Sequence, residues 1–129
     1  MTTSDAEQVV VRFVAAWERG DVDELLDFFS EDAVWHAMPM EPAVGKPAIR
    51  VLVSAWLQHH AQGDGPRTTP RGRIQRQVSD GKVVMHERTD AASIDGQEVE
   101  LPVAAVFEIE DGRITAFREY FDMSPFARR

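Results

Sequence analysis

Hydrophobic residues near the start of the chain recur at helical spacing. Val10, Phe13, Val14 and Trp17 occupy positions i, i+3, i+4 and i+7, and Gly20 follows them. This spacing places all four side chains on one face of an α-helix, and glycine commonly ends a helix. The sequence therefore predicts an amphipathic helix that starts at the Ser4 cap and stops at Gly20.

Three further elements are expected before the middle of the chain. Asp21 and Glu24 have the spacing of a helix cap and precede a short apolar run up to Phe29. The β-branched and aromatic stretch from Asp32 to Met38 predicts a strand. A third helix is expected from Pro47 to about His59, since proline suits the first turn of a helix.

The second half of the chain has a different regularity. Asp-Gly dipeptides occur at Asp80-Gly81, Asp95-Gly96 and Asp111-Gly112, after a turn-rich connection over residues 62–70. Asp-Gly favours tight hairpin turns, so this half predicts a four-stranded antiparallel meander. The register of the first hairpin stays open, because a two-residue turn there places Ile74 and Val78 outside. The fold class is α+β: one domain over residues 1–129, with three helices on a curved sheet.

A two-residue turn at Asp95-Gly96 fixes which residues of the two flanking strands face each other. The resulting pairs are Ile94 with Gln97, Ala92 with Val99, Asp90 with Leu101, Arg88 with Val103, His86 with Ala105 and Val84 with Phe107. The second strand is apolar on this side and carries glutamates on the other. The apolar side is therefore the core side, and it also holds His86, Arg88 and Asp90.

The next hairpin extends this face onto the last strand. A two-residue turn at Asp111-Gly112 pairs Val103 with Tyr120 and Leu101 with Asp122. We therefore expect Asp122 on the inner face, about 9–10 Å from Asp90 at the backbone. The Arg88 side chain can reach between the two aspartates.

Two carboxylates and a guanidinium on an apolar face have two interpretations. They can form a buried ion triad that fixes the sheet, although such a triad is costly to desolvate. They can also form an acid–base pair, because burial and repulsion favour one shared proton while arginine favours ionisation. From the residues alone, both interpretations stay open.

Composition narrows the classes of partner. The net charge is −8 at pH 7, so no basic excess neutralises phosphates and nucleic-acid binding is not expected. The chain has no cysteine, and no spacing links its four histidines into a metal site. No apolar stretch reaches membrane-spanning length, and the first residues do not read as a signal peptide. A cytoplasmic protein without metal or cofactor is expected.

Three motifs resemble the limonene-1,2-epoxide hydrolase family: ERTD (Glu87 to Asp90), the run from Val103 to Asp122, and MPMEPAVGK (Met38 to Lys46). The resemblance implies a cone-shaped α+β fold with a mixed sheet (cystatin-like), shared with nuclear transport factor 2, ketosteroid isomerase and SnoaL-like polyketide cyclases. It also implies one-step addition of water to an epoxide without metal or covalent intermediate. Asp90 is then the acid, Arg88 the bridge between the carboxylates, and Asp122 the base.

The sequence departs from the family at the site of the attacking water. The family holds this water with a tyrosine and an asparagine on the first strand, and Trp35 and Ala37 stand there in this chain. Residues expected to line an apolar substrate pocket are Phe13, Trp17, Leu25, Trp35, Ala37, His86, Leu101, Val103, Phe107 and Tyr120. Phe117 joins this set only if it does not follow strict strand alternation.

The leading hypothesis is an epoxide hydrolase acting on a small apolar epoxide of terpenoid, steroid or polyketide type. One alternative is an isomerase or cyclase on the same scaffold, with His36 or His86 as base. Another is a non-catalytic small-molecule-binding protein in which the triad is structural. The outer face of the sheet mixes apolar residues with glutamates, so a homodimer is expected.

Overall fold

The computed structural model describes residues 5–61, 71–94 and 97–124. Its elements in chain order are α1 (Asp5–Ala16), η1 (Trp17–Arg19), α2 (Val22–Asp27), β1 (Phe29–Met38), β2 (Ala43–Val44), α3 (Lys46–Ala61), β3 (Arg71–Ser79), β4 (Val83–Ile94), β5 (Gln97–Glu110) and β6 (Arg113–Tyr120). The three expected helices and the four-stranded meander are confirmed. The Ser4 cap, the connection over residues 62–70 and the Asp95-Gly96 turn lie outside the described residues.

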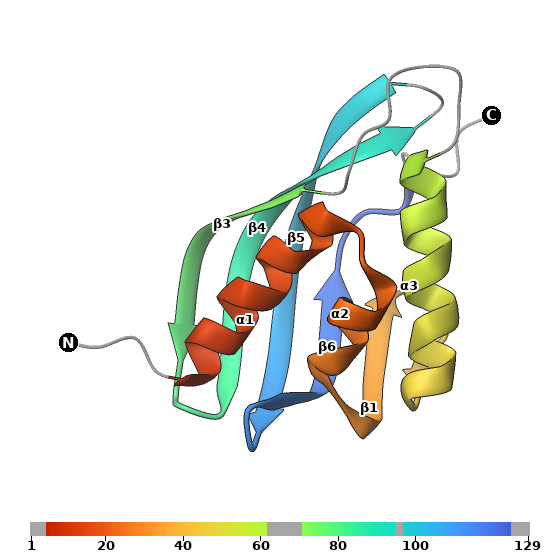
Figure 1. Cartoon of the computed structure of the whole chain (residues 1–129). Helices are drawn as coiled ribbons and strands as arrows, with labels where there is room; N and C mark the ends of the chain where they lie inside the picture. The colour runs from red at the N-terminus through yellow and green to blue at the C-terminus, as the bar shows by residue number, and fades with distance from the viewer. Residues whose placement is uncertain (1–4, 62–70, 95–96, 125–129) are drawn as a thin grey trace.

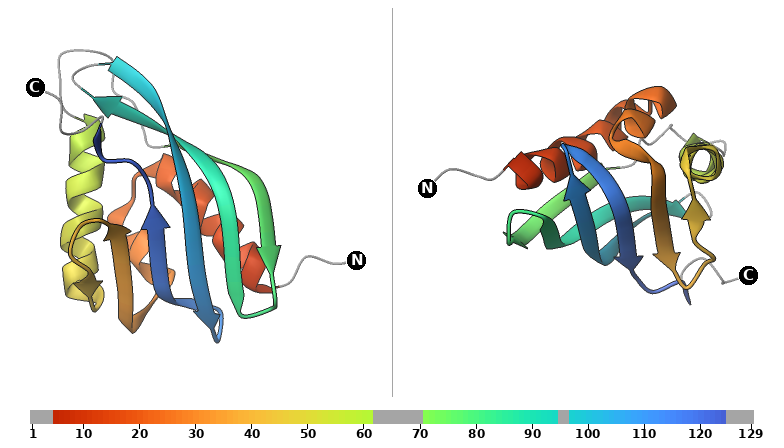
Figure 2. Two further views of the ribbon diagram at one scale, coloured as in Figure 1. Left: turned by 180° about the vertical axis from the view of Figure 1, so that it is seen from behind. Right: turned by 90° about the horizontal axis from the view of Figure 1, so that it is seen from below.

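The strands form one curved, unclosed sheet in the order β2-β1-β6-β5-β4-β3 (Figure 1). β1 and β6 are parallel and every other neighbouring pair is antiparallel, so the sheet is mixed. The helices lie on one face, and the opposite face is bare of helices when viewed from behind (Figure 2). The expected α+β class with a cone-shaped sheet is confirmed.

The connection between α1 and α2 is built as the sequence predicts. Gly20 has a φ of +67°, and its N–H donates to the Trp17 carbonyl at 3.2 Å. The Asp21 side chain then accepts from the Glu24 N–H at 3.2 Å and caps α2. This turn lets α1 and α2 cover the same face of the sheet.

The predicted register between β4 and β5 is confirmed at every pair. Asp90 faces Leu101, Arg88 faces Val103 and His86 faces Ala105. Leu101, Val103 and Ala105 are all buried, so this side of the two strands is the core side.

The register between β5 and β6 holds only for the first two pairs after the turn. Glu110 pairs with Arg113 and Ile109 with Ile114, but the register then shifts by one residue at Thr115. This β-bulge exchanges the two faces of the rest of β6. Phe117 and Glu119 therefore point inward, and the inward placement expected for Tyr120 and Asp122 is wrong.

A second bulge, in β3, settles the register that the sequence leaves open. The pairing with β4 shifts between Ile74 and Arg76, so Gly72 lies opposite Asp90 and Gln77 lies opposite His86. Val78 is consequently 66% exposed on the outer face.

The core lies between the helices and the sheet and contains a cluster of aromatic rings beneath α1. The Phe13 ring makes edge contacts with Phe29, Phe107 and Phe117 at centroid distances of 5.4, 6.1 and 5.4 Å. Phe107 stacks on Phe117 at 4.5 Å. The inward turn of Phe117 at the bulge therefore completes the core.

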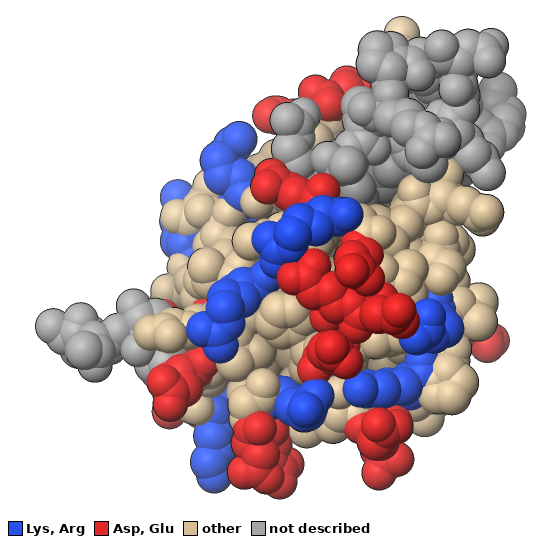
Figure 3. Space-filling model, viewed as in Figure 1, with Lys and Arg blue, Asp and Glu red and all other residues tan. Residues whose placement is uncertain are grey.

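The helical side of the surface mixes acidic and basic side chains (Figure 3). Arg19 pairs with Glu24 at 2.7 Å, and Arg50 pairs with Asp23 at 2.7 Å. Exposed pairs of this kind contribute little to stability, so the fold depends on its core.

None of the helices within the described residues is long and apolar enough to cross a membrane.

Phe29→Ala tests the aromatic core, since Phe29 is fully buried against Phe13 and Trp35. We expect the free energy of unfolding to fall by about 3–5 kcal/mol in urea denaturation. The exposed control Val78→Ala should change it by less than about 0.5 kcal/mol. Equal effects of the two changes would contradict the described core.

Candidate active site

The Arg88 guanidinium lies at the centre of a polar cluster on the inner face of the sheet. The residue is only 6% exposed. Its Nε donates to Asp90 Oδ1 at 2.8 Å and its Nη2 to Asp90 Oδ2 at 3.1 Å. Nη2 also donates to Glu119 Oε2. One guanidinium is thus bonded to two carboxylates from different strands.

Glu119 supplies the second carboxylate of this cluster from β6. It is 7% exposed, and its Oε1 accepts from the Trp35 indole N–H at 2.8 Å. Burial raises the pKa of Glu119 above its usual range, and the neighbouring Arg88 opposes that rise. Sequence reasoning missed this residue because it followed strict alternation through Thr115.

Asp122 does not take part in the cluster, and the expected contact with Arg88 is wrong. It follows the end of β6 and is exposed. Its carboxylate accepts from the Ser124 backbone N–H and hydroxyl, both at 2.9 Å. These two bonds lower its pKa. The physical reason is the bulge at Thr115. After it, the odd-numbered residues of β6 face inward, so Glu119 lies on the inner face and Asp122 does not.

His86 occupies the third side of the Arg88 guanidinium. Its Nε2 lies 3.2 Å from Arg88 Nη1, and its Nδ1 lies 3.0 Å from Gln77 Oε1 on β3. Burial, assisted by the charge of Arg88, lowers the pKa of His86 to about 3. His86 is therefore a neutral member of the cluster near pH 7.

Trp35 and Ala37 form an apolar wall beside Glu119. They are 2% and 1% exposed, and the Trp35 ring stacks on Phe117 at 5.4 Å. The only donor of the Trp35 side chain is directed at Glu119, and Ala37 has none. The first strand thus holds the carboxylate itself through the indole.

Most residues expected to line a pocket share the inner side of the sheet. Buried members of the set are Phe13, Leu25, Trp35, Ala37, His86, Leu101, Val103 and Phe107. Trp17 is partly buried and packs against the same core. Tyr120 is 46% exposed on the outer face, so its expected inward position is wrong for the reason that applies to Asp122. Substrate contact by the other residues stays a prediction.

Gly72 on β3 makes room for the Asp90 carboxylate. A Cβ atom at this position would lie 2.9 Å from Asp90 Oδ1 and 2.9 Å from Val14 Cγ1 on α1. The absence of a side chain lets α1 pack directly over the cluster. Sequence reasoning missed Gly72, because its partner on β4 depends on the bulge in β3.

The cluster can exchange a proton. With both carboxylates ionised, its net charge in a buried setting is −1, so one additional proton makes it neutral. One carboxyl group of such a pair can serve as acid while the other serves as base. Within the described part of the chain, no group of three or more His, Asp or Glu residues could hold a metal ion.

Most of the chain is similar in sequence to one family of proteins. Residues 10–117 match the SnoaL-like domain, so the chain belongs to the SnoaL-like family. An LEH-like epoxide hydrolase from Mycobacterium tuberculosis has a structure with TM-score 0.76 and 31% identity, over 95% of this chain and 86% of that one. The predicted resemblance to limonene-1,2-epoxide hydrolases is thereby confirmed.

Two further proteins are similar to this chain, one over a short segment of sequence and one in fold. Epoxide hydrolase EphG of Mycobacterium tuberculosis is 49% identical over 51 residues, which cover 40% of this chain and only 34% of that protein. A protein with a ketosteroid isomerase-like fold from Catenulispora acidiphila, in complex with trimethylamine, has TM-score 0.81. Its 17% identity, over 96% of this chain and 91% of that one, shows the fold alone.

Gly72→Ala tests the close packing of α1, Gly72 and Asp90. The added methyl group should lower the free energy of unfolding by about 1–3 kcal/mol. Val14→Ala removes one of the two close contacts, so the double variant should be less destabilised than the sum of the single variants by about 0.5–3 kcal/mol. Additive effects in urea denaturation would show that residues 14 and 72 do not meet.

Glu119→Gln tests the raised pKa of Glu119. In the folded protein Glu119 keeps its proton at pH values above 4.5, the ordinary pKa at which the unfolded chain releases it. Stability from this proton is fully present below that pKa and is lost as pH rises through the folded-state pKa. The free energy of unfolding of the wild type should therefore fall relative to the variant as pH rises. Parallel pH curves would contradict the raised pKa.

Proposed function

We propose that the protein opens the epoxide ring of a small apolar substrate by adding water at Asp90, Arg88 and Glu119. The observation that carries the proposal is the pair of carboxylates bonded to one buried guanidinium on a mainly apolar face. An acid and a base held in fixed relation are what concerted ring opening requires. Membership of the SnoaL-like family and the likeness to an LEH-like epoxide hydrolase support it.

The roles of the two carboxylates follow from their exposure. The Asp90 side chain is 27% exposed, whereas the side chains of Arg88 and Glu119 are 7% and 9% exposed. Asp90 is thus the member that a substrate reaches most easily, which suits the acid. Glu119 is the more buried of the two and lies beside Trp35 and Ala37, the positions at which the family holds the attacking water, which suits Glu119 as the base.

The proposed step balances in atoms and charge. In the reactive form the proton of the cluster lies on Asp90, which gives it to the epoxide oxygen while one carbon–oxygen bond of the ring breaks. The water oxygen bonds to that carbon, and the Glu119 carboxylate takes a proton from the water. The product is a diol, and the cluster is restored when the proton returns from Glu119 to Asp90. Arg88 keeps its charge throughout and holds both carboxylates in place.

A second candidate function differs only in the nucleophile. The Trp35 indole N–H donates to Glu119, and Ala37 offers no polar group, so neither of these two residues has a side chain that holds water. A hydroxyl group of the substrate itself could then take the place of water. The product would be a cyclic ether in place of a diol, with the same acid and base.

The test is turnover of cyclic and steroid epoxides in ¹⁸O-labelled water, with products identified by mass spectrometry. We expect a diol with one labelled oxygen. Asp90→Asn and Glu119→Gln should each lower kcat/KM by about 100- to 10,000-fold, because each removes one proton-transfer group. The matched control Asp122→Asn should retain near-wild-type turnover, since Asp122 lies outside the cluster.

Three results would overturn the proposal in different ways. Loss of turnover in Asp122→Asn but not in Glu119→Gln would assign the base to Asp122. An unlabelled cyclic ether from a hydroxy-epoxide, without diol, would favour the second candidate. Absence of any product from epoxides, together with consumption of a dienone or β-keto substrate without incorporation of water, would favour an isomerase.

A further inference from the structure

The Arg88 guanidinium has a neutral acceptor on the side that the carboxylates leave free. Its Nη1 lies 3.2 Å from His86 Nε2, while its Nε and Nη2 donate to Asp90 and Glu119. His86 in turn contacts Gln77 Oε1 through Nδ1 at 3.0 Å. The chain of contacts therefore runs from β3 through β4 to the two carboxylates.

The donors and acceptors in this chain fix the state of the imidazole ring. Arginine has only N–H donors, so His86 Nε2 must accept and carries no proton. The ring proton then lies on Nδ1, and this N–H donates to the side-chain amide oxygen Oε1 of Gln77. An imidazolium would instead point an N–H at the Arg88 N–H, and that contact would be lost.

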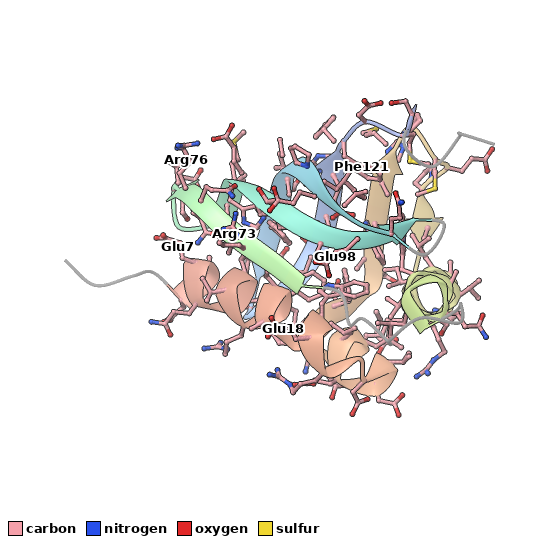
Figure 4. The ribbon with its side chains drawn as sticks, turned by 90° about the horizontal axis from the view of Figure 1, so that it is seen from above. Glu7, Glu18, Arg73, Arg76, Glu98 and Phe121 are labelled. Carbon is pink, nitrogen blue, oxygen red and sulfur yellow. The ribbon has the colours of Figure 1, made fainter. Side chains whose placement is uncertain are left out.

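The bulge in β3 is what brings Gln77 to His86. Strict alternation from Ile74 would turn Arg76 and Val78 inward. With the register shift, Arg76 points away from α1 and pairs with Glu87 (Figure 4). Gln77 takes the inner position opposite His86. A neutral amide thus stands where alternation would have put a cation or an apolar group.

The surroundings of His86 keep the ring neutral. On β5 it faces Ala105 and packs its ring against Phe107 at 5.1 Å, and the residues of α1 that cover the core are apolar. Among the described residues, Arg88 is the charged group that influences it, and Gln77 is its uncharged partner on β3. Arg88 and burial both oppose protonation.

We propose that Gln77 and His86 are positioning residues for Arg88. They hold the third side of its guanidinium with a bond that carries no charge and does not titrate near neutral pH. Asp90 and Glu119 then remain the only members of the cluster that exchange a proton. The role of Arg88 positioning in catalysis rests on the proposed function, whereas the neutral state of the His86 ring does not.

The state of the ring is measured directly by ¹H–¹⁵N correlation NMR of the histidine side chains, with the His86 signals assigned from their absence in His86→Gln. We expect a protonated Nδ1, an unprotonated Nε2 and no titration of His86 between pH 5 and 8. A proton on Nε2, or titration of His86 near its ordinary pKa of 6.5, would overturn the proposal.

Gln77→Glu places a carboxylate at His86 Nδ1, with Gln75→Glu as its control. Gln75 lies on the same strand and donates to Thr89, away from His86. An added charge at residue 77 should allow His86 to protonate between pH 5 and 8, and this titration should be absent in the control. Equal NMR titrations of the two variants would overturn the proposal, whether or not an epoxide substrate has been found.

With an epoxide substrate in hand, the pH profile of kcat/KM separates positioning from a merely structural role. Gln77→Glu should show a new ionisation between pH 5 and 8, with activity about 10- to 100-fold lower on the acid side, because Arg88 loses its acceptor. Gln75→Glu should keep the wild-type profile. A profile of Gln77→Glu identical to that of the control would contradict a role in positioning Arg88.

Discussion

A single buried cation, the Arg88 guanidinium, determines how the inner face of this sheet is built. Removing a guanidinium from water is costly unless charged and hydrogen-bonding partners surround it. Here Asp90, Glu119 and His86 occupy its three sides, and they come from β4 and β6. The same contacts that offset the burial of Arg88 also hold two carboxylates at fixed positions. Stability of the cluster and its capacity for acid–base chemistry thus have one origin.

Two β-bulges turn the residues of this cluster toward the inner face of the sheet. The bulge at Thr115 turns Glu119 inward, and the bulge before Arg76 turns Gln77 inward. Each bulge exchanges the faces of the residues that follow it, at the cost of one unpaired position in the ladder. Gly72, on the inner side of β3, leaves room for both Asp90 and α1. The irregular positions of the sheet are therefore the ones that assemble the site.

Much of this arrangement could be predicted from sequence, because tight turns and an alternating apolar pattern constrain register. The pairing of Arg88 with Val103 and of Asp90 with Leu101 followed from one Asp-Gly turn. The bulge at Thr115 has no equally strong local signal, so the second carboxylate was assigned to Asp122. Phe117 was a signal for the bulge, since strict alternation left this large aromatic side chain outside the core. Placing Phe117 inward also places Glu119 inward, and this would have identified the second carboxylate.

Asp90 and Glu119, and not Asp122, share the Arg88 guanidinium. Carbon-13 NMR of the side-chain carboxyl groups across a pH titration tests this arrangement most directly, because each carboxyl carbon reports its own protonation. We predict that Glu119 titrates above its ordinary pKa of 4.5 and that Asp122 titrates separately, below its ordinary pKa of 3.8. Titration of Glu119 at its ordinary pKa, or a raised pKa of Asp122, would contradict this arrangement.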